Sequence, residues 1–153
     1  MSSPPPGRPT VDQVGRILLA RTKDDQGHEV GTFDSTTRPT DVEVDGHIDA
    51  AMALIAPKLP LLDKLPPDLL PSVAEVVAYR AALRIEKAYW PEQVRQNRSA
   101  YDQLNAEYQE DLASLIETAE AAAGGSEYEM APIVSLKVGS WTSIPQAGGV
   151  FPA

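Results

Sequence analysis

Histidine is the side chain that most often transfers protons or binds metals near neutral pH, and this sequence contains two. His28 lies in a segment rich in turn-forming residues, and His47 lies near the start of an expected helix. Neither has a second histidine at the spacing of a metal site, and the chain of 153 residues has no cysteine. We therefore expect both histidines to be polar surface residues, with no thiolate metal site and no disulfide.

Carboxylates are the other candidates for catalysis or metal binding. The segment DVEVDG at 41–46 resembles the first half of a calcium-binding loop, but the last ligand position falls on Met52, which has no carboxylate. The adjacent acids at 24–25 and 110–111 lack the apolar surroundings that would raise a carboxyl pKa. The chain has no glycine-rich phosphate-binding loop and no GxSxG motif. We expect a protein that is not an enzyme, with no catalytic residues, no cofactor and no metal.

Three basic residues stand at helical spacing in an otherwise apolar segment. Arg80, Arg84 and Lys87 occupy positions i, i+4 and i+7, which share one face of a helix. One interpretation is that they form the solvent-facing stripe of that helix, reaching toward acids of the following helix. The other is that they form salt bridges between subunits. On the second interpretation, the candidate inter-subunit contacts are Arg80, Arg84, Lys87, Tyr101, Tyr108, Glu110 and Asp111.

Two expected helices, 68–89 and 92–123, hold these residues and meet at Trp90-Pro91. The first is apolar most of the way round, which indicates a central helix with neighbours on several sides. The second has one apolar stripe, and at 1.5 Å per residue it would be about 48 Å long. Because a helix of this length exceeds what a small domain needs, we expect another chain beside it. The stripe consists of Val94, Tyr101, Leu104, Tyr108, Leu112, Leu115, Ile116 and Ala119.

The segments before this pair alternate between helix and turn. Four prolines in 1–9 predict an extended arm that does not pack. Thr10 is the expected N-cap of a helix that reaches about residue 21. The segment 22–39 has the composition of a loop or short hairpin, a type of long loop that often binds partners. Thr40 and Glu43 have the spacing of a capping box at the start of a helix that ends before Pro57.

The segment 124–153 predicts an extended arm. Gly124-Gly125 is expected to end the long helix, and several later glycines and prolines argue against further helix. The arm nevertheless has many apolar residues, which need a surface on another element or another chain. We therefore predict a mainly α fold, a small bundle of about four helices with a long C-terminal helix and a long loop or hairpin after the first helix. The domain would span 10–123, between the extended arms 1–9 and 124–153.

The balance of charge limits the possible partners. The formal net charge is −9, and residues 91–153 carry nine acidic and three basic side chains. Binding to a phosphate backbone needs clustered Lys and Arg, so we expect no nucleic-acid-binding surface. No apolar run approaches the roughly 18 residues that a membrane span needs, so we expect no membrane contact. The segment MSSPPPGRPT lacks the apolar core of a signal peptide, which favours a protein made and kept in the cytosol.

Three segments together carry a resemblance to a known family. They are ARTKD at 20–24, GTF at 31–33 with TRPT at 37–40, and IEKAYWPE at 85–92. With the order of helices around them, they resemble the head-to-tail connector (adaptor) proteins of long-tailed bacteriophages, especially those that infect actinobacteria. The resemblance covers about 10–123. The motifs are moderately specific and none is a catalytic signature; the arm 124–153 lies outside the resemblance.

The resemblance implies a virion structural protein made in the host cytoplasm. It would form a ring, commonly twelvefold, below the portal at the capsid vertex and above a head-closure (stopper) protein or the tail. DNA would pass through the lumen during genome ejection without sequence-specific binding. A closed ring would also supply the partners that the long helix needs. Candidate contacts with the portal or neck proteins are Phe33 and Arg38 in the loop and Ile133, Val134, Leu136, Val138, Trp141, Ile144, Val150 and Phe151 in the arm.

One alternative from a different class stays open at this point. A small cytosolic helical binding module, such as an assembly chaperone or a regulator absent from virions, would have the same composition. A DNA-binding regulator is disfavoured by the acidic charge, and an enzyme is disfavoured by the lack of motifs.

Overall fold

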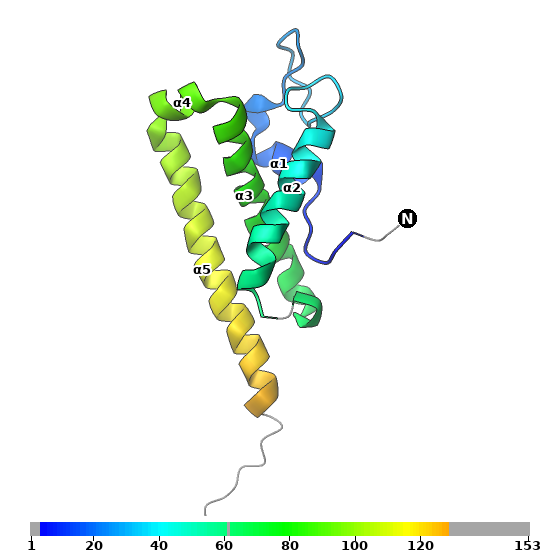
Figure 1. The fold of residues 1–153 in the computed structure, drawn as a ribbon, viewed down its shortest axis with the longest axis vertical. Helices are drawn as coiled ribbons and strands as arrows, with labels where there is room; N and C mark the ends of the chain where they lie inside the picture. The colour runs from blue at the N-terminus through cyan, green and yellow to red at the C-terminus, as the bar shows by residue number, and fades with distance from the viewer. Residues whose placement is uncertain (1–3, 61, 129–153) are drawn as a thin grey trace, which may run out of the picture.

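The computed structural model describes residues 4–60 and 62–128, which form a mainly helical bundle (Figure 1). Five α-helices lie in this part of the chain: α1 (Val11–Ile17), α2 (Asp41–Ile55), α3 (Leu70–Tyr89), α4 (Pro91–Gln96) and α5 (Arg98–Tyr128). Short 3₁₀ turns connect them at η1 (Leu19–Arg21), η2 (Ala56–Lys58), η3 (Leu62–Lys64) and η4 (Pro67–Leu69). The predicted class, a small helical bundle with a long C-terminal helix, is confirmed.

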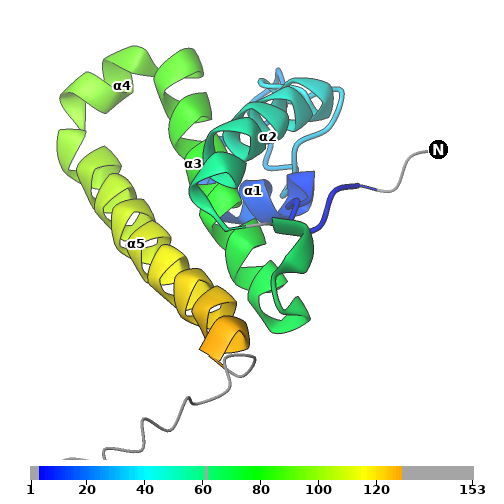
Figure 2. The same ribbon diagram turned by 60° about the horizontal axis from the view of Figure 1, so that its bottom comes forward.

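Helix α3 is the centre of the bundle, as its apolar composition predicts. It packs against α1, α2 and α5, and the short α4 joins its end to α5 (Figures 1 and 2). Burial on several sides explains why its apolar residues surround most of the helix. The buried residues of α3 are Val73, Ala74, Val76, Val77, Ala78, Ala81, Ala82, Leu83 and Ile85.

Capping boxes fix the starts of the two N-terminal helices. The hydroxyl of Thr40 accepts a hydrogen bond from the backbone N–H of Glu43, whose carboxylate accepts one from the backbone N–H of Thr40. Thr10 and Gln13 make the same reciprocal pair at the start of α1. Each box satisfies backbone donors that the helix itself leaves free. The predicted cap at Thr10 and the predicted box at Thr40 are therefore both confirmed.

The long helix differs from its prediction at both ends. The expected single helix from about residue 92 is divided at Asn97, whose φ of −115° and ψ of 56° separate α4 from α5. At the other end, α5 continues through Gly124 to Tyr128, so the predicted stop at Gly124-Gly125 is wrong. A glycine costs a helix only about 1 kcal/mol relative to alanine, and it does not forbid the next turn.

The described part of the N-terminal arm packs, contrary to the prediction. Arg8 forms ion pairs with Asp45 at 2.7 Å and with Asp49 at 2.9 Å, both on α2. Pro9 is fully buried, and Gly7 adopts a φ of +73° against Val73 of α3. The composition indicated an extended arm, but it did not show that Arg8 would find two acids one helical turn apart.

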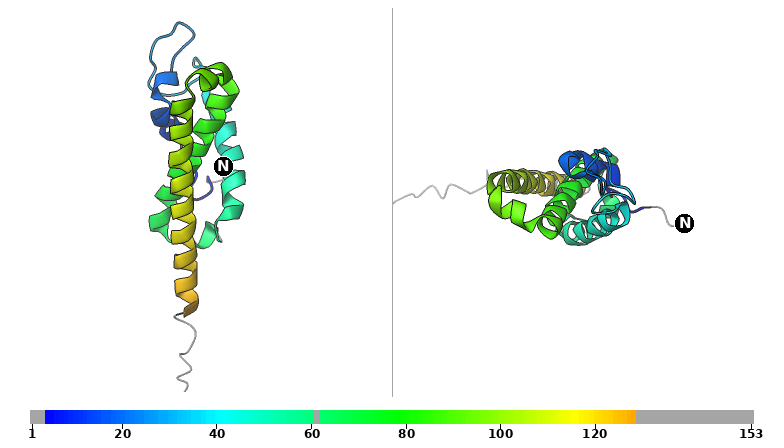
Figure 3. Two further views of the ribbon diagram at one scale, coloured as in Figure 1. Left: turned by 90° about the vertical axis from the view of Figure 1, so that its left-hand side faces the viewer. Right: turned by 90° about the horizontal axis from the view of Figure 1, so that it is seen from above.

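The loop 22–39 projects from the end of the molecule where α4 lies (Figures 1 and 3). Its tip is a turn in which the backbone N–H of Gly27 donates to the carbonyl of Asp24 at 3.0 Å, and an isolated bridge joins Lys23 to Glu29. The hairpin-like turn agrees with the prediction, although no strand forms within the described residues. The second half of the loop folds inward, where Phe33 and Thr37 are buried.

Candidate interaction surfaces

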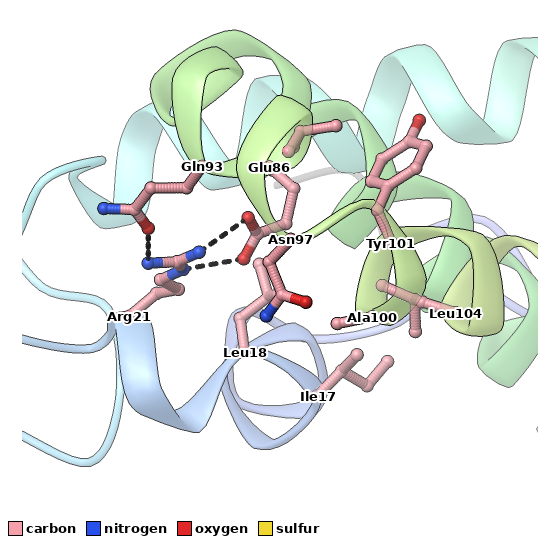
Figure 4. A pocket seen from close by; sticks show the side chains of 10 residues that line it. Ile17, Leu18, Arg21, Glu86, Gln93, Asn97, Ala100, Tyr101 and Leu104 are labelled. Atoms are coloured by element: carbon pink, nitrogen blue, oxygen red, sulfur yellow. Dashed lines mark hydrogen bonds and ion pairs between the residues drawn. The ribbon is translucent and has the colours of Figure 1, made fainter.

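Arg21 joins three elements at the end of the bundle where α4 lies. Its guanidinium donates to both carboxylate oxygens of Glu86 on α3, at 2.7 and 3.0 Å, and also to the amide oxygen of Gln93 on α4 (Figure 4). It also lies over the ring of Trp90, 4.7 Å from the centroid. A planar guanidinium suits this combination of bidentate pairing and stacking. The predictions did not include this cluster, because 65 residues separate Arg21 from Glu86 in sequence.

The cluster borders a cavity of about 240 Å³ between α1, α3, α4 and α5. Figure 4 shows Arg21 and Glu86 at one side of the cavity, with Tyr101 and Leu104 contributed by α5. The residues that line it are Ile17, Leu18, Arg21, Glu86, Gln93, Val94, Asn97, Ala100, Tyr101 and Leu104. Its single carboxylate, that of Glu86, is already paired with Arg21.

The three basic residues predicted as one row do share a face of α3, between α2 and α5. The guanidinium of Arg80 lies 5.5 Å from the ring centroid of Tyr108 on α5. Arg84 points toward α2, where its charge lowers the pKa of His47. Lys87 is exposed. Within the described residues none of the three forms an ion pair, and the buried Nε of Arg84 has no hydrogen-bond acceptor.

A row of acids lies on the opposite side of α5 from its buried stripe. Glu110 and Glu117 are exposed and, at 100° per residue, point about 180° away from the buried residues. Glu120 extends the row by one turn and is exposed as well. No ion partner for these three acids lies within the described residues. The buried stripe, which packs toward α3, is formed by Tyr108, Leu112, Leu115 and Ala119.

The remaining predicted subunit contacts are placed differently by the structure. Tyr108 is 3% exposed and belongs to the core, so its prediction as an inter-subunit contact is wrong. Asp111 is half-buried and borders a small cavity with Glu75 of α3, facing its own chain. Tyr101 is half-buried beside the larger cavity, whereas Glu110 is free at the surface. The helical spacing of the apolar stripe predicts that Tyr108 is buried, because a large aromatic side chain within such a stripe packs in the core of its own chain.

The predicted contacts with the portal or neck proteins also lie in different surroundings. Phe33 is 3% exposed and packs in the hydrophobic core, so its prediction as a partner contact is wrong. Its ring fills space beside Gly15 of α1, which the composition of the loop did not reveal. Arg38 is exposed, just before a cis peptide bond to Pro39. The predicted contacts of the C-terminal arm, from Ile133 to Phe151, lie outside the described residues.

The two histidines lie in different surroundings. His28 is exposed, as expected, and its Nδ1 lies 3.0 Å from the carboxylate of Asp24. Hydrogen bonds from the backbone and ring of His28 lower the pKa of Asp24. His47 is half-buried, more than expected, and lies edge-on to Tyr89 at 6.0 Å between ring centroids. Burial, and then the charge of Arg84, lower the pKa of His47, whereas Glu43 opposes that shift.

Between residues 4 and 128, with the gap at 61, no helix is long and apolar enough to span a membrane. In the same part of the chain, no group of three or more histidines and acids is arranged to hold a metal ion.

Comparisons with known proteins identify no relative: no family model, no curated protein and no solved structure matches the chain.

Proposed function

We propose that this chain is a structural head-to-tail adaptor of a long-tailed bacteriophage, with no catalytic role. Copies of it would form a ring, twelvefold in the commonest arrangement, between the portal and a head-closure or tail protein in the virion. DNA would pass through the lumen of this ring without base-specific contacts.

Helix α5 carries the proposal. It has 31 residues and would be about 46 Å long, yet between residues 98 and 124 only the stripe facing α3 is buried. None of its residues from Arg98 to Glu107 is buried. A helix that extends so far beyond its own core gains more from neighbours in an assembly than from its own chain.

The geometry of the resembling segments supports the same proposal. ARTKD and IEKAYWPE, which are more than 60 residues apart in sequence, are joined by the ion pair of Arg21 with Glu86 and by the stacking of Arg21 on Trp90. Two of the three segments that resemble the connector family therefore meet at one end of the bundle.

Two experiments test the proposed role in the phage that encodes the chain. Mass spectrometry of purified virions is expected to find the protein at a fixed ratio to the portal. Deletion of its gene is expected to leave DNA-filled heads and free tails that do not join, and supply of the intact gene should restore joining. Infectious particles of normal yield that lack the protein would contradict the proposal.

The second candidate is a helical binding module that takes part in assembly and is absent from virions. The observation that favours it is the core of α1, α2 and α3, which closes within one chain. The virion measurement separates the two candidates, because only the adaptor stays in the finished particle.

A further inference from the structure

We infer that adjacent copies of this chain are held together by pairing of two charged rows. The basic row, Arg80, Arg84 and Lys87 on α3 of one copy, would meet the acidic row, Glu110, Glu117 and Glu120 on α5 of the next. This inference rests on the proposed ring and names the surfaces that build it.

Among the described residues, the basic row has no carboxylate partner in its own chain, although Arg80 lies over the ring of Tyr108. Arg84 is only half-exposed, and its buried Nε has no hydrogen-bond acceptor. The acid nearest to the row on α3, Glu86, is already bound by Arg21. His47, which faces Arg84 from α2, is neutral or positively charged and therefore supplies no negative charge. A guanidinium held in this way is stabilised by a carboxylate supplied from outside.

The acidic row cannot turn back to satisfy the basic row of the same chain. Tyr108 and Leu112 hold the opposite side of α5 against α3, so Glu110 and Glu117 face outward. Rotation of α5 to bring these acids to α3 would expose its buried stripe. The two rows can therefore meet only between two molecules.

The spacing of Arg80 and Lys87 in the basic row matches that of Glu110 and Glu117 in the acidic row. Arg80 and Lys87 are seven residues apart on α3, as are Glu110 and Glu117 on α5, which is about 10.5 Å along each helix. Two helices side by side can therefore bring both pairs of charges together at once. The exposed Ala106 and Ala113 on the same side of α5 leave room for a close approach of the neighbouring helix.

An exposed apolar side chain lies on the face of α2 that carries His47, the neighbour of Arg84. Leu54 follows His47 by two turns on the same face of α2 and is 44% exposed. A contact that covers Leu54 would combine apolar burial with charge pairing, the usual composition of a specific protein interface. Because each chain carries both rows on different sides, the contact can repeat from copy to copy and close into a ring.

Charge reversal of each row tests the pairing. One variant carries Arg80→Glu and Lys87→Glu, and the other carries Glu110→Lys and Glu117→Lys. The mass of the oligomer is measured by light scattering for the full chain, both alone and with the purified portal of the same phage. Each variant alone is expected to associate at least about tenfold more weakly than the wild type, because like charges then face each other.

Mixing the variants gives the decisive result. In an equimolar mixture each reversed row faces an oppositely charged row, so the ring mass should return, with the two variants alternating around the ring. A chain with all four reversals should also assemble by itself. Any one of three results would overturn the pairing: each variant alone associates as strongly as the wild type, the mixture stays dissociated, or assembly stops at two copies.

Two control variants carry the same changes in net charge at positions outside the two rows. Lys58→Glu with Lys64→Glu, and Asp63→Lys with Asp68→Lys, place the same changes at exposed positions between α2 and α3 and should leave assembly unchanged. If thermal melting shows that Arg80→Glu prevents folding, the exposed pair Lys87→Glu and Glu110→Lys repeats the test. A wild-type chain that never assembles, alone or on the portal, would contradict the adaptor function itself. Assembly that is unchanged by the charge reversals would contradict only the pairing of the two rows.

Discussion

Arg21 shows how one side chain can order an entire end of this molecule. It contacts α3 through Glu86, α4 through Gln93 and the junction between them through Trp90. The side chains of Arg21 and Glu86 are 27% and 14% exposed, so the pair is screened by solvent only in part. The Arg95–Glu92 pair has side chains 75% and 71% exposed and provides a natural comparison.

Replacement of Arg21 by Ala is expected to lower the free energy of unfolding by about 1–3 kcal/mol, because Glu86 loses its partner while it stays half-buried. The matched variant Arg95→Ala should cost about 0.5 kcal/mol or less, since exposed pairs contribute little. Urea unfolding of both variants measures the difference. Equal losses would show that Arg21 is no more than a surface residue.

His47 gives the stability of the fold a dependence on pH. Its folded pKa lies below the ordinary 6.5, through burial and then through Arg84, so the unfolded chain takes up the proton more readily. Stability should therefore fall as the pH drops through 6.5 toward the lower folded pKa. The variant His47→Gln should lose less stability than the wild type between roughly pH 7.5 and pH 5.5, as measured by urea unfolding. Equal losses in both chains would contradict this role; His28, present in both, cancels in the comparison.

At the scale of elements, two glycines differ in whether their surroundings would accept a side chain. Gly15 lies in the middle of α1, and a Cβ added there would meet neighbouring atoms at 3.5–3.8 Å, which is ordinary contact. Gly7 has a φ of +73°, and an added Cβ would lie 2.7 Å from the Val73 side chain. The first glycine weakens its helix, whereas the second is required by the packing of the arm.

The variant Gly15→Ala is expected to raise the free energy of unfolding by up to about 1 kcal/mol, through the helix propensity of alanine. The variant Gly7→Ala should lower it by about 1–3 kcal/mol, because the backbone or Val73 must move. Thermal and urea unfolding of the two variants should therefore shift in opposite directions. A Gly7→Ala variant as stable as the wild type would show that the arm does not pack on α3 as described.

Features that depend on residues close together in the sequence can be predicted from the sequence alone. The capping box of Thr40 and Glu43 lies within four residues, and the buried stripe of α5 follows from helical periodicity, so both were predictable. The pairing of Arg21 with Glu86 has no local signal, because it depends on how α3 returns past the end of α1. Phe33 was mistaken for a partner contact for the same reason: the loop has the composition of a surface segment, and only the tertiary fold turns its ring inward.

At the scale of the whole molecule, the segment after α5 is predicted to act in docking. A chain that ends before Pro132 should keep the core of α1, α2, α3 and α5, because the core residues that the structure describes, from Val14 to Ala119, pack against one another. It should melt close to the intact chain but bind the portal or the neck protein more weakly. Co-sedimentation with purified portal rings measures the binding. Full retention of head-to-tail joining by the shortened chain would contradict a docking role for the arm.

Assembly is central to the proposed role, because the described residues of one copy leave the outer side of α5 exposed and supply no carboxylate to the basic row of α3. The most direct measurement is the mass and symmetry of the purified full-length protein, alone and bound to the portal, by light scattering and electron microscopy. A ring is expected, with a mass of about 200 kDa if twelve chains of 16.5 kDa close it. A chain that stays strictly monomeric at high concentration and in the presence of the portal would contradict the account.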